Sequence, residues 1–279
     1  MLRIKERKVY DLAASGEVPC SRATGKLLFP RKQVDAWLAA NASGGEASNA
    51  APRPNVMVGS HDPLLEWALR ESRCGLATYF DSSLDGLDRF AGGEALATGL
   101  HVYHTTSDTW NIPSVQSRFV NQSVVLVRWA TRQRGIILRP DGAQQISSLA
   151  GLFESKIVRR QPEAGSQVLL EALLMREGIE PSDLDWTNSA RSEVDAVLAV
   201  QEGKADAAFG LAALAAQYRL EFIPIVEECF DLLVDRRCWF ESPWQTLLTF
   251  CRTSEFAQRA EEMAGYSIDD QFSVLYNSD

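Results

Sequence analysis

The chain has 279 residues, of which 46% are hydrophobic and 23% charged, and 28 basic against 37 acidic residues give it a net charge of −9. This composition supports a sizeable folded core, and no apolar run approaches the roughly 18–20 residues that a membrane span requires. The charge is uneven, since residues 1–38 hold eight basic and four acidic side chains (net +4) and the remainder holds 20 and 33 (net −13). We call this basic N-terminal part the head and the acidic part beyond it the body. The basic charge of the head predicts that it binds a polyanion, and the acidic charge of the body predicts that the body binds a different kind of partner.

The residue types that would support a metal site, a disulfide or catalysis are scarce or badly spaced. The five cysteines lack metal-type spacing, which favours reduced thiols in a cytoplasmic protein. The charged N-terminus has no signal-peptide pattern. His101 and His104 have no Cys or carboxylate set to complete a zinc site. No nucleophile elbow, phosphate-binding loop or dinucleotide fingerprint occurs, so we expect no metal and no catalysis.

The sequence pattern of the basic head predicts a helix, a two-stranded wing and a second helix. Apolar residues at helical spacing predict a helix over Lys5–Ser15, which Gly16 ends. Short extended pieces at 17–22 and 26–30 predict the wing, and a helix follows at 31–40. A helix beside a basic wing is a recurrent DNA-binding arrangement.

The head resembles a specific DNA-binding family. The segment KVYDLAASGEVPCSRATGKLLFPRKQVDAWL resembles the excisionase-like, MerR-type winged helix-turn-helix family. The resemblance implies that the helix enters the major groove and that the wing touches phosphates, which suits cationic side chains. The DNA-binding residues that it implies are Lys5, Arg7, Lys8 and Tyr10 on the helix and Arg22 and Lys26 on the wing.

The head departs from that family at its start. The family has a further helix before this segment, and the present sequence begins where that helix would end. We therefore expect a truncated winged helix-turn-helix head at 1–40 with its first helix missing. Either the start lies upstream of Met1 or the chain is shortened, and a decayed head that no longer binds DNA is the alternative.

A flexible tether and an α/β body follow the head. Residues 41–55 are rich in Gly, Ala, Ser, Asn and Pro and predict a linker. Beyond it, alternating strands and helices predict a parallel, doubly wound sheet. Strands are predicted at 56–60, 74–80, 97–101, 124–129, 135–138, 156–159, 207–210, 222–226 and 231–234, and helices at 62–70, 84–91, 165–177, 192–201, 244–253 and 255–264.

Three turns of the body share one pattern, in which a predicted strand ends and a serine-bearing turn begins a helix. They lie at 59–62, 81–83 and 165–167. Backbone N–H groups and serine hydroxyls at helix N-termini form anion sites, and in open α/β sheets such turns meet at the ligand-binding edge. Plain helix capping is the alternative for any one of them.

The body is similar to a known family over nearly all of 56–266. The segments that carry the likeness include GSHDPLLEWAL (59–69), RQPEAGSQVLLEALL (160–174) and ARSEVDAVLAVQEGKADAAFG (190–210). They resemble the periplasmic binding protein superfamily, in the variant fused to helix-turn-helix heads in molybdate- or tungstate-responsive regulators. By that resemblance, the candidate ligand-binding residues are Ser60, His61, Ser82, Ser83, Arg160, Gly165, Ser166, Gln167 and Arg191.

Two positions differ from the family pattern. The chain has Glu163 where relatives often have glycine, and Ser192-Glu193 where they tend to have Thr-His. A carboxylate that pointed at a bound anion would be unfavourable. A ligand other than molybdate or tungstate is therefore the open alternative.

These observations together predict a cytoplasmic, ligand-responsive DNA-binding regulator. The expected fold is an α/β, two-lobed, type II periplasmic-binding-protein-like body at 56–279, behind the winged head. One lobe comprises about 56–128 with 228–279, and the other about 129–227. The expected partners are DNA, a small anion such as molybdate or tungstate and a second copy of the chain, with no membrane and no other cofactor. A ligand-binding or storage protein with a decayed head is the alternative.

Overall fold

The computed structural model describes residues 6–22, 25, 27–30, 33–34, 37, 52–120, 122–140 and 146–278. Its contacts divide the chain into two compact units, Met1–Pro52 and Arg53–Asp279. Most of the predicted linker lies outside the described residues. Within these ranges, no helix combines the length and apolar character that crossing a bilayer demands.

The described residues of the first unit include a short helix and a β-bridge. Helix α1 spans Glu6–Ala14, and Gly16 follows with a left-handed φ of 73°, as the sequence predicted for a helix end. Ser21 and Leu28 form an antiparallel bridge between the two predicted pieces of the wing. Residues 33, 34 and 37 are helical, and the rest of the predicted second helix lies outside the described residues.

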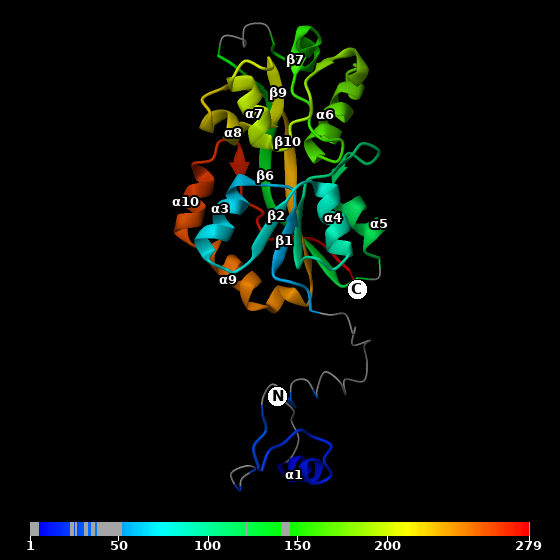
Figure 1. Ribbon diagram of the computed structural model, residues 1–279, viewed down its shortest axis with the longest axis vertical. Coiled ribbons are helices and arrows are strands. Elements are labelled where there is room, and N and C mark those ends of the chain that lie inside the picture. The colour runs from blue at the N-terminus through cyan, green and yellow to red at the C-terminus, as the bar shows by residue number, and fades with distance from the viewer. Residues whose placement is uncertain are drawn as a thin grey trace. The chain divides into compact units, whose positions relative to one another are not determined.

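The described residues of the second unit form a mixed ten-stranded sheet with helices on both faces (Figure 1). Eight strands follow the order β2-β1-β3-β10-β6-β9-β7-β8, and β11 and β12 pair with β6. The strands are β1 (Val56–Gly59), β2 (Ala77–Phe80), β3 (Ala97–Leu100), β6 (Val124–Leu138), β7 (Lys156–Ile157), β8 (Asp185–Trp186), β9 (Ala207–Leu211), β10 (Glu221–Asp235), β11 (Tyr266–Ser267) and β12 (Val274–Asn277); β4 (Tyr103–His104) and β5 (Thr109–Trp110) form a separate hairpin.

The helices connect these strands in chain order. They are α3 (Pro63–Ser72), α4 (Ser83–Ala91), α5 (Ile112–Arg118), α6 (Gly165–Arg176), α7 (Glu193–Gln201), α8 (Ala212–Gln217), α9 (Ser242–Phe250) and α10 (Ser254–Glu261), with short 3-10 turns at Leu149–Glu154, Pro181–Asp183 and Cys238–Phe240. The sequence predicted most of these elements. It missed α5, α8, β8, the β4–β5 hairpin and the two short C-terminal strands.

Two long strands, β6 and β10, run through the whole body (Figure 1). Each has 15 residues, and they pair antiparallel from Glu221–Leu138 to Asp235–Val124. The sequence predicted two separate strands in each segment and a parallel sheet. The prediction of parallel pairing holds for β1–β3 and for β7–β9 but is wrong for β6 and β10, which lie antiparallel to their neighbours.

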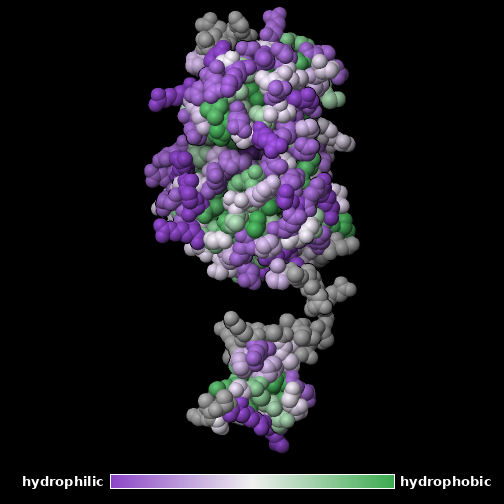
Figure 2. Space-filling model, in the orientation of Figure 1, coloured by the Kyte–Doolittle hydropathy of each residue, from purple (hydrophilic) through white to green (hydrophobic). Residues whose placement is uncertain are grey.

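The long strands join two lobes that have separate hydrophobic cores. In the first lobe, α3, α9 and α10 cover one face around Trp129 and Trp244, and α4 and α5 cover the other around Phe90 and Phe119. In the second lobe, α6 packs on one face and α7 and α8 on the other. Hydrophilic residues predominate on the face shown in Figure 2, with hydrophobic residues in small groups.

The chain enters the body at Arg53, whose side chain is anchored to the end of β10. Its Nε donates to Asp235 Oδ2 at 2.7 Å, and its Nη1 donates to the carbonyls of Phe90 and Ala95. Asp235 is the last residue of β10. The point of entry is therefore fixed to a strand that passes through both lobes.

Candidate functional site

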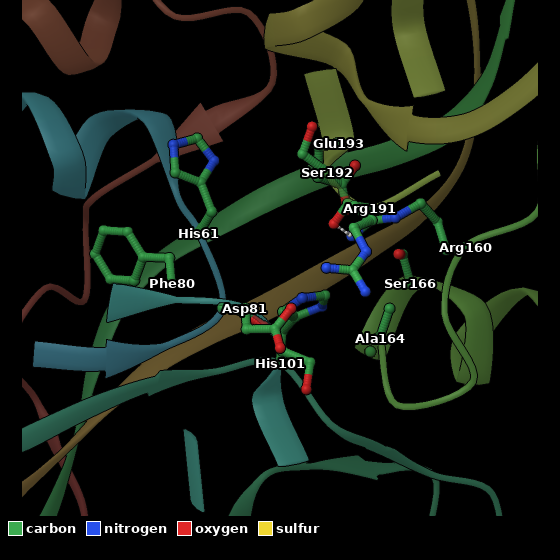
Figure 3. Close-up of a pocket in the computed structure, with 13 residues that line it drawn as sticks. His61, Phe80, Asp81, His101, Arg160, Ala164, Ser166, Arg191, Ser192 and Glu193 are labelled. Atoms are coloured by element: carbon green, nitrogen blue, oxygen red, sulfur yellow. Dashed lines mark hydrogen bonds and ion pairs between the residues drawn. The ribbon is translucent and has the colours of Figure 1, made fainter. Parts of the chain in front are cut away.

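A pocket lies where helix beginnings from both lobes meet beside the long strands (Figure 3). Its cavity volume is about 50 Å³. The first lobe contributes Ser60, His61, Phe80, Asp81, Ser82 and His101, and the second contributes Arg160, Ala164, Gly165, Ser166, Arg191, Ser192 and Glu193. Figure 3 shows His61 and Phe80 on one side of the pocket and Arg160 and Ser166 on the other.

The serines of the first lobe already have partners within the protein. Ser60 Oγ and Ser83 Oγ lie 2.7 Å apart, and Ser83 Oγ also accepts a hydrogen bond from the backbone N–H of His101. Ser82 caps α4 by accepting from the N–H of Asp85 at 3.1 Å. Plain helix capping, the alternative that the sequence left open, therefore accounts for Ser82.

The beginning of α6 differs from the other helix beginnings at the pocket. Its N-cap, Ala164, has no side chain that can accept a hydrogen bond. Ser166 is 2% exposed, and its Oγ has no hydrogen-bond partner among the described residues. The first N–H groups of a helix also lack partners inside the helix. This end of α6 thus presents uncapped donors and an unsatisfied hydroxyl to the cavity.

Two arginines accompany α6. Arg160 is buried, and its Nε and Nη2 donate to the carbonyls of Ala190 and Arg191. Its Nη1 lies 3.2 Å from Glu193 Oε1 but makes no hydrogen bond to a described residue. The Arg191 side chain is exposed and makes no ion pair with the described part of the chain. Arg160 Nη1 and the Arg191 guanidinium are therefore available donors at the pocket.

A buried charge row runs from one lobe to the other and reaches the pocket lining at Glu193; its members are Asp62, Arg132, Glu228, Arg134 and Glu193. Arg132 Nη1 donates to Asp62 Oδ2 at 2.8 Å, and Nη2 donates to Glu228 Oε1. Arg134 Nε donates to Glu228 Oε2 at 2.7 Å, and its Nη1 donates to both oxygens of Glu193. Asp62 also caps α3. The row therefore connects a helix beginning in each lobe through the middle of β6 and β10.

The arginines of the row keep Glu228 and Glu193 ionised. Burial alone would raise the pKa of Glu228, but Arg132 and Arg134 hold that pKa well below its usual range. Burial likewise opposes the charge of Glu193, and Arg134 and Arg160 lower its pKa instead. The two glutamates therefore form buried ion pairs with Arg132, Arg134 and Arg160.

His101, in the first lobe, contacts both the charge row and the beginning of α6 in the second lobe. Its Nδ1 lies 3.0 Å from Glu228 Oε2, and its ring stacks on Phe230 at 5.9 Å. Burial lowers the pKa of His101 more than Glu228 raises it, so the imidazole stays neutral at pH 7. A Cβ placed on Gly165 would lie 2.7 Å from the carbonyl oxygen of His101, so glycine permits this close approach of the lobes.

The structure brings most of the predicted ligand-binding residues together. Seven line the pocket, namely Ser60, His61, Ser82, Arg160, Gly165, Ser166 and Arg191. Ser83 lies behind Ser60, and Gln167 accepts from the Arg160 backbone N–H with Oε1 at 2.9 Å, outside the lining. Glu163 is exposed and is not part of the lining.

The sequence analysis did not predict the charge row, nor that His101 and Glu193 line the pocket. The available signal was the run Arg128-Trp129-Ala130-Thr131-Arg132-Gln133-Arg134 inside an apolar strand pattern, with Glu228 in its antiparallel neighbour. Charged residues in such a strand usually mark a solvated face. Here Arg132, Arg134 and Glu228 are all 1% exposed or less.

The predicted DNA-binding residues are only partly within the described residues. Arg7 and Arg22 are exposed, and Tyr10 is 55% exposed. Lys5, Lys26 and the side chain of Lys8 lie outside the described residues. The described part of the chain also holds no cluster of three His, Cys, Asp or Glu that could bind a metal.

Comparison with known proteins agrees with this division of the chain. Residues 66–252 match the family model of a PBP superfamily domain, and residues 1–42 match that of a helix-turn-helix domain. A relative, "Uncharacterized protein YvgK" of Bacillus subtilis (strain 168), is 24% identical over 255 residues, covering 84% of this chain and 82% of that protein.

Solved structures share the fold of the body at low sequence identity. The regulatory domain of MetR, a LysR family regulator from N. meningitidis, has a TM-score of 0.54 at 12% identity and covers 76% of this chain and 95% of that one. The ancestral amino acid-binding protein AncCDT-1, a precursor of cyclohexadienyl dehydratase, has a TM-score of 0.51 at 13% identity, covering 75% and 93%. The predicted α/β, binding-protein-like fold is thereby confirmed, as is its fusion to a helix-turn-helix domain.

Proposed function

The chain belongs to the PBP superfamily, and we propose that it is a ligand-responsive DNA-binding regulator whose body closes on a small anion. One observation carries the proposal: the uncapped start of α6, the unpartnered Ser166 hydroxyl and the Arg191 guanidinium face one cavity. Backbone N–H groups at a helix start favour an anion, and a nearby arginine adds charge-assisted hydrogen bonds.

The size of the cavity favours a very small ligand. A water molecule needs roughly 10–15 Å³ of such volume, so about 50 Å³ accommodates only a few water-sized atoms. A tetrahedral oxyanion has five non-hydrogen atoms, whereas drug-sized ligands occupy about 300–1,000 Å³. We therefore place the ligand among the tetrahedral oxyanions, the class that includes molybdate and tungstate.

The helix-turn-helix domain supports a regulatory role for this binding. A ligand that contacts both lobes favours the closed body over the open one, by as much as its affinities for the two states differ. Helix-turn-helix proteins commonly read two half-sites as dimers. A homodimer in the cytoplasm, in which body closure alters the spacing of two heads, follows from this proposal.

Calorimetry of the full chain with molybdate, tungstate, sulfate and phosphate tests the ligand class. We expect heat from at least one anion, and Arg191→Gln should weaken its binding about tenfold or more because a charge-assisted donor is lost. Arg159→Gln is the matched control, since Arg159 is exposed and lies over Trp186, outside the pocket lining. Absence of heat from all four anions would remove the oxyanion proposal.

A gel-shift titration tests the regulatory role separately. We expect the full chain to bind its operator with an affinity that changes when the anion is added, and Arg7→Gln to reduce DNA binding without changing the calorimetric result. Arg7 is exposed on α1. Anion binding with no DNA binding, even after upstream residues are restored, would favour the storage protein with a decayed head.

A further inference from the structure

We propose that Glu193 selects, among small tetrahedral anions, one that carries its own hydrogen-bond donor, such as hydrogen phosphate, over fully deprotonated sulfate, molybdate and tungstate. The inference rests on the proposed anion pocket and goes beyond it by assigning a specificity-determining residue. It also departs from the molybdate or tungstate ligand that the sequence resemblance implies.

The charges that line the pocket do not favour a bare dianion. Arg160 and Arg191 contribute two positive charges, and Asp81 and Glu193 contribute two negative ones. With the histidines counted as neutral, the formal charge of the lining is +2 − 2 = 0. A bound dianion would therefore meet, beside the donors, a carboxylate that can only accept hydrogen bonds.

Glu193 is the carboxylate that such an anion meets in a dry environment. Its side chain is 9% exposed, whereas Asp81 is exposed and screened by water. Arg134 Nη1 contacts its two oxygens at 3.0 and 3.1 Å, and Arg160 Nη1 approaches Oε1 at 3.2 Å. A carboxylate has about four lone-pair positions, so acceptor capacity remains toward the cavity.

Glu193 also stays ionised, which fixes it as an acceptor. Burial opposes its charge, but Arg134 and Arg160 lower its pKa. An ionised carboxylate has no proton to donate, so it repels an anion whose every exposed atom is an acceptor. An anion with one O–H group can turn that contact into a hydrogen bond, because the proton lies between the two oxygens.

The other polar groups of the pocket suit the remaining oxygens of such an anion. The start of α6, Arg160 Nη1 and Arg191 are donors, and the Ser166 hydroxyl can donate because it has no other partner among the described residues. The lining thus combines several donors with one obligate acceptor. A site of this kind rejects an analogue that lacks the matching donor, since its acceptor is then left unpaired.

Hydrogen phosphate and sulfate form a matched pair for the test. At mildly alkaline pH both are tetrahedral dianions, and only hydrogen phosphate has an O–H group. Calorimetry of the full chain should show hydrogen phosphate binding about tenfold or more tightly than sulfate, molybdate or monofluorophosphate, which is also a dianion without a proton. Glu193→Gln should abolish this preference, mainly by tightening sulfate binding.

Glu163→Gln is the control, because it removes the same charge from an exposed position just before α6 and outside the lining. It should leave the preference unchanged. Equal binding of sulfate and hydrogen phosphate by the native chain would overturn the inference but would leave the proposed anion pocket intact. This comparison uses only the native chain, so it does not depend on whether Glu193→Gln folds. No heat from any anion would remove both the pocket and the inference.

Discussion

Asp231 is a buried carboxylate beside the bulge in β10, and burial disfavours its ionised form. It is 1% exposed, accepts a hydrogen bond from Asn111 Nδ2 at 2.7 Å and lies 3.2 Å from Arg128 Nε. Burial raises its pKa from 3.8 to about 6, because the loss of hydration outweighs the attraction of Arg128. The folded protein therefore binds this proton more tightly than the unfolded chain does.

The sign of the resulting pH dependence follows from linkage. As pH rises from about 3 to about 7, through both pKa values, the native protein should lose about 3 kcal/mol of unfolding free energy relative to Asp231→Asn. Urea unfolding of both proteins at several pH values measures this difference. Asp270→Asn, at an exposed position, is the control and should show no such trend. A difference between native protein and Asp231→Asn that does not vary with pH would contradict the assignment.

Individual pocket residues were predictable where they follow a strand and begin a helix. Ser60, Ser82 and Ser166 stand in such turns, and the structure brings all three to one cavity. Sequence could not tell which serine is free, because the partners of Ser60 and Ser82 depend on tertiary contacts and local capping. Arg132 and Arg134 were not predictable as site residues, since only the packing of both sheet faces shows that they are buried.

The beginning of α6 touches the opposite lobe at Gly165. A methyl group there would lie 2.7 Å from the His101 carbonyl oxygen and 2.9 Å from its ring, so Gly165→Ala should force the lobes apart. We expect anion affinity to fall about tenfold or more and stability by about 1–3 kcal/mol. Calorimetry and urea unfolding measure the two effects.

Gly92→Ala serves as the control for this change. Gly92 has φ −70° at the end of α4, and its nearest neighbour to an added Cβ is 3.5 Å away. The free energy of unfolding of the Gly92→Ala variant should stay the same or rise slightly, and its anion affinity should stay the same. If Gly165→Ala also left both quantities unchanged, the close approach of α6 to His101 would have no bearing on binding.

Predictions for elements succeeded where periodicity was strong and failed where charges interrupted it. The helices α3, α4, α6 and α7 begin within about two residues of their predicted starts. The strands β6 and β10 were each divided in two, because Arg132-Gln133-Arg134 and Glu227-Glu228 resemble turn or surface sequence. The short helix α8 was missed because six mostly apolar residues after a strand carry no helical period.

The whole molecule consists of two compact units, and this predicts separable behaviour. A fragment comprising Arg53–Asp279 should fold, bind the anion with the affinity of the full chain and fail to shift operator DNA. At about 100 times the Kd, ligand adds about 2.7 kcal/mol of stability, which raises the Tm of a body of this size by about 5–10 °C. Thermal unfolding of fragment and full chain with and without anion measures this, and a shift confined to the full chain would refute it.

At this scale, composition and charge indicated two units, and strand–helix alternation indicated an α/β body. The antiparallel course of the long strands was not predictable, because periodicity shows which segments are strands and not the direction in which distant segments pair. Contacts between Glu221–Asp235 and Val124–Leu138 span a large sequence separation. The likeness to a family supplied the expectation of two lobes.

The attachment of Arg53 to Asp235 has a mechanical consequence for signalling. Asp235 ends a strand whose middle carries Glu228, so the backbone of β10 and the Arg53–Asp235 ion pair connect the charge row to the first residue of the body. If the lobes open and close around a ligand, as proposed, a change in the torsion of that backbone reaches the residue at which the body begins. Under the proposed function, ligand occupancy would therefore be transmitted to Arg53, the first residue of the body.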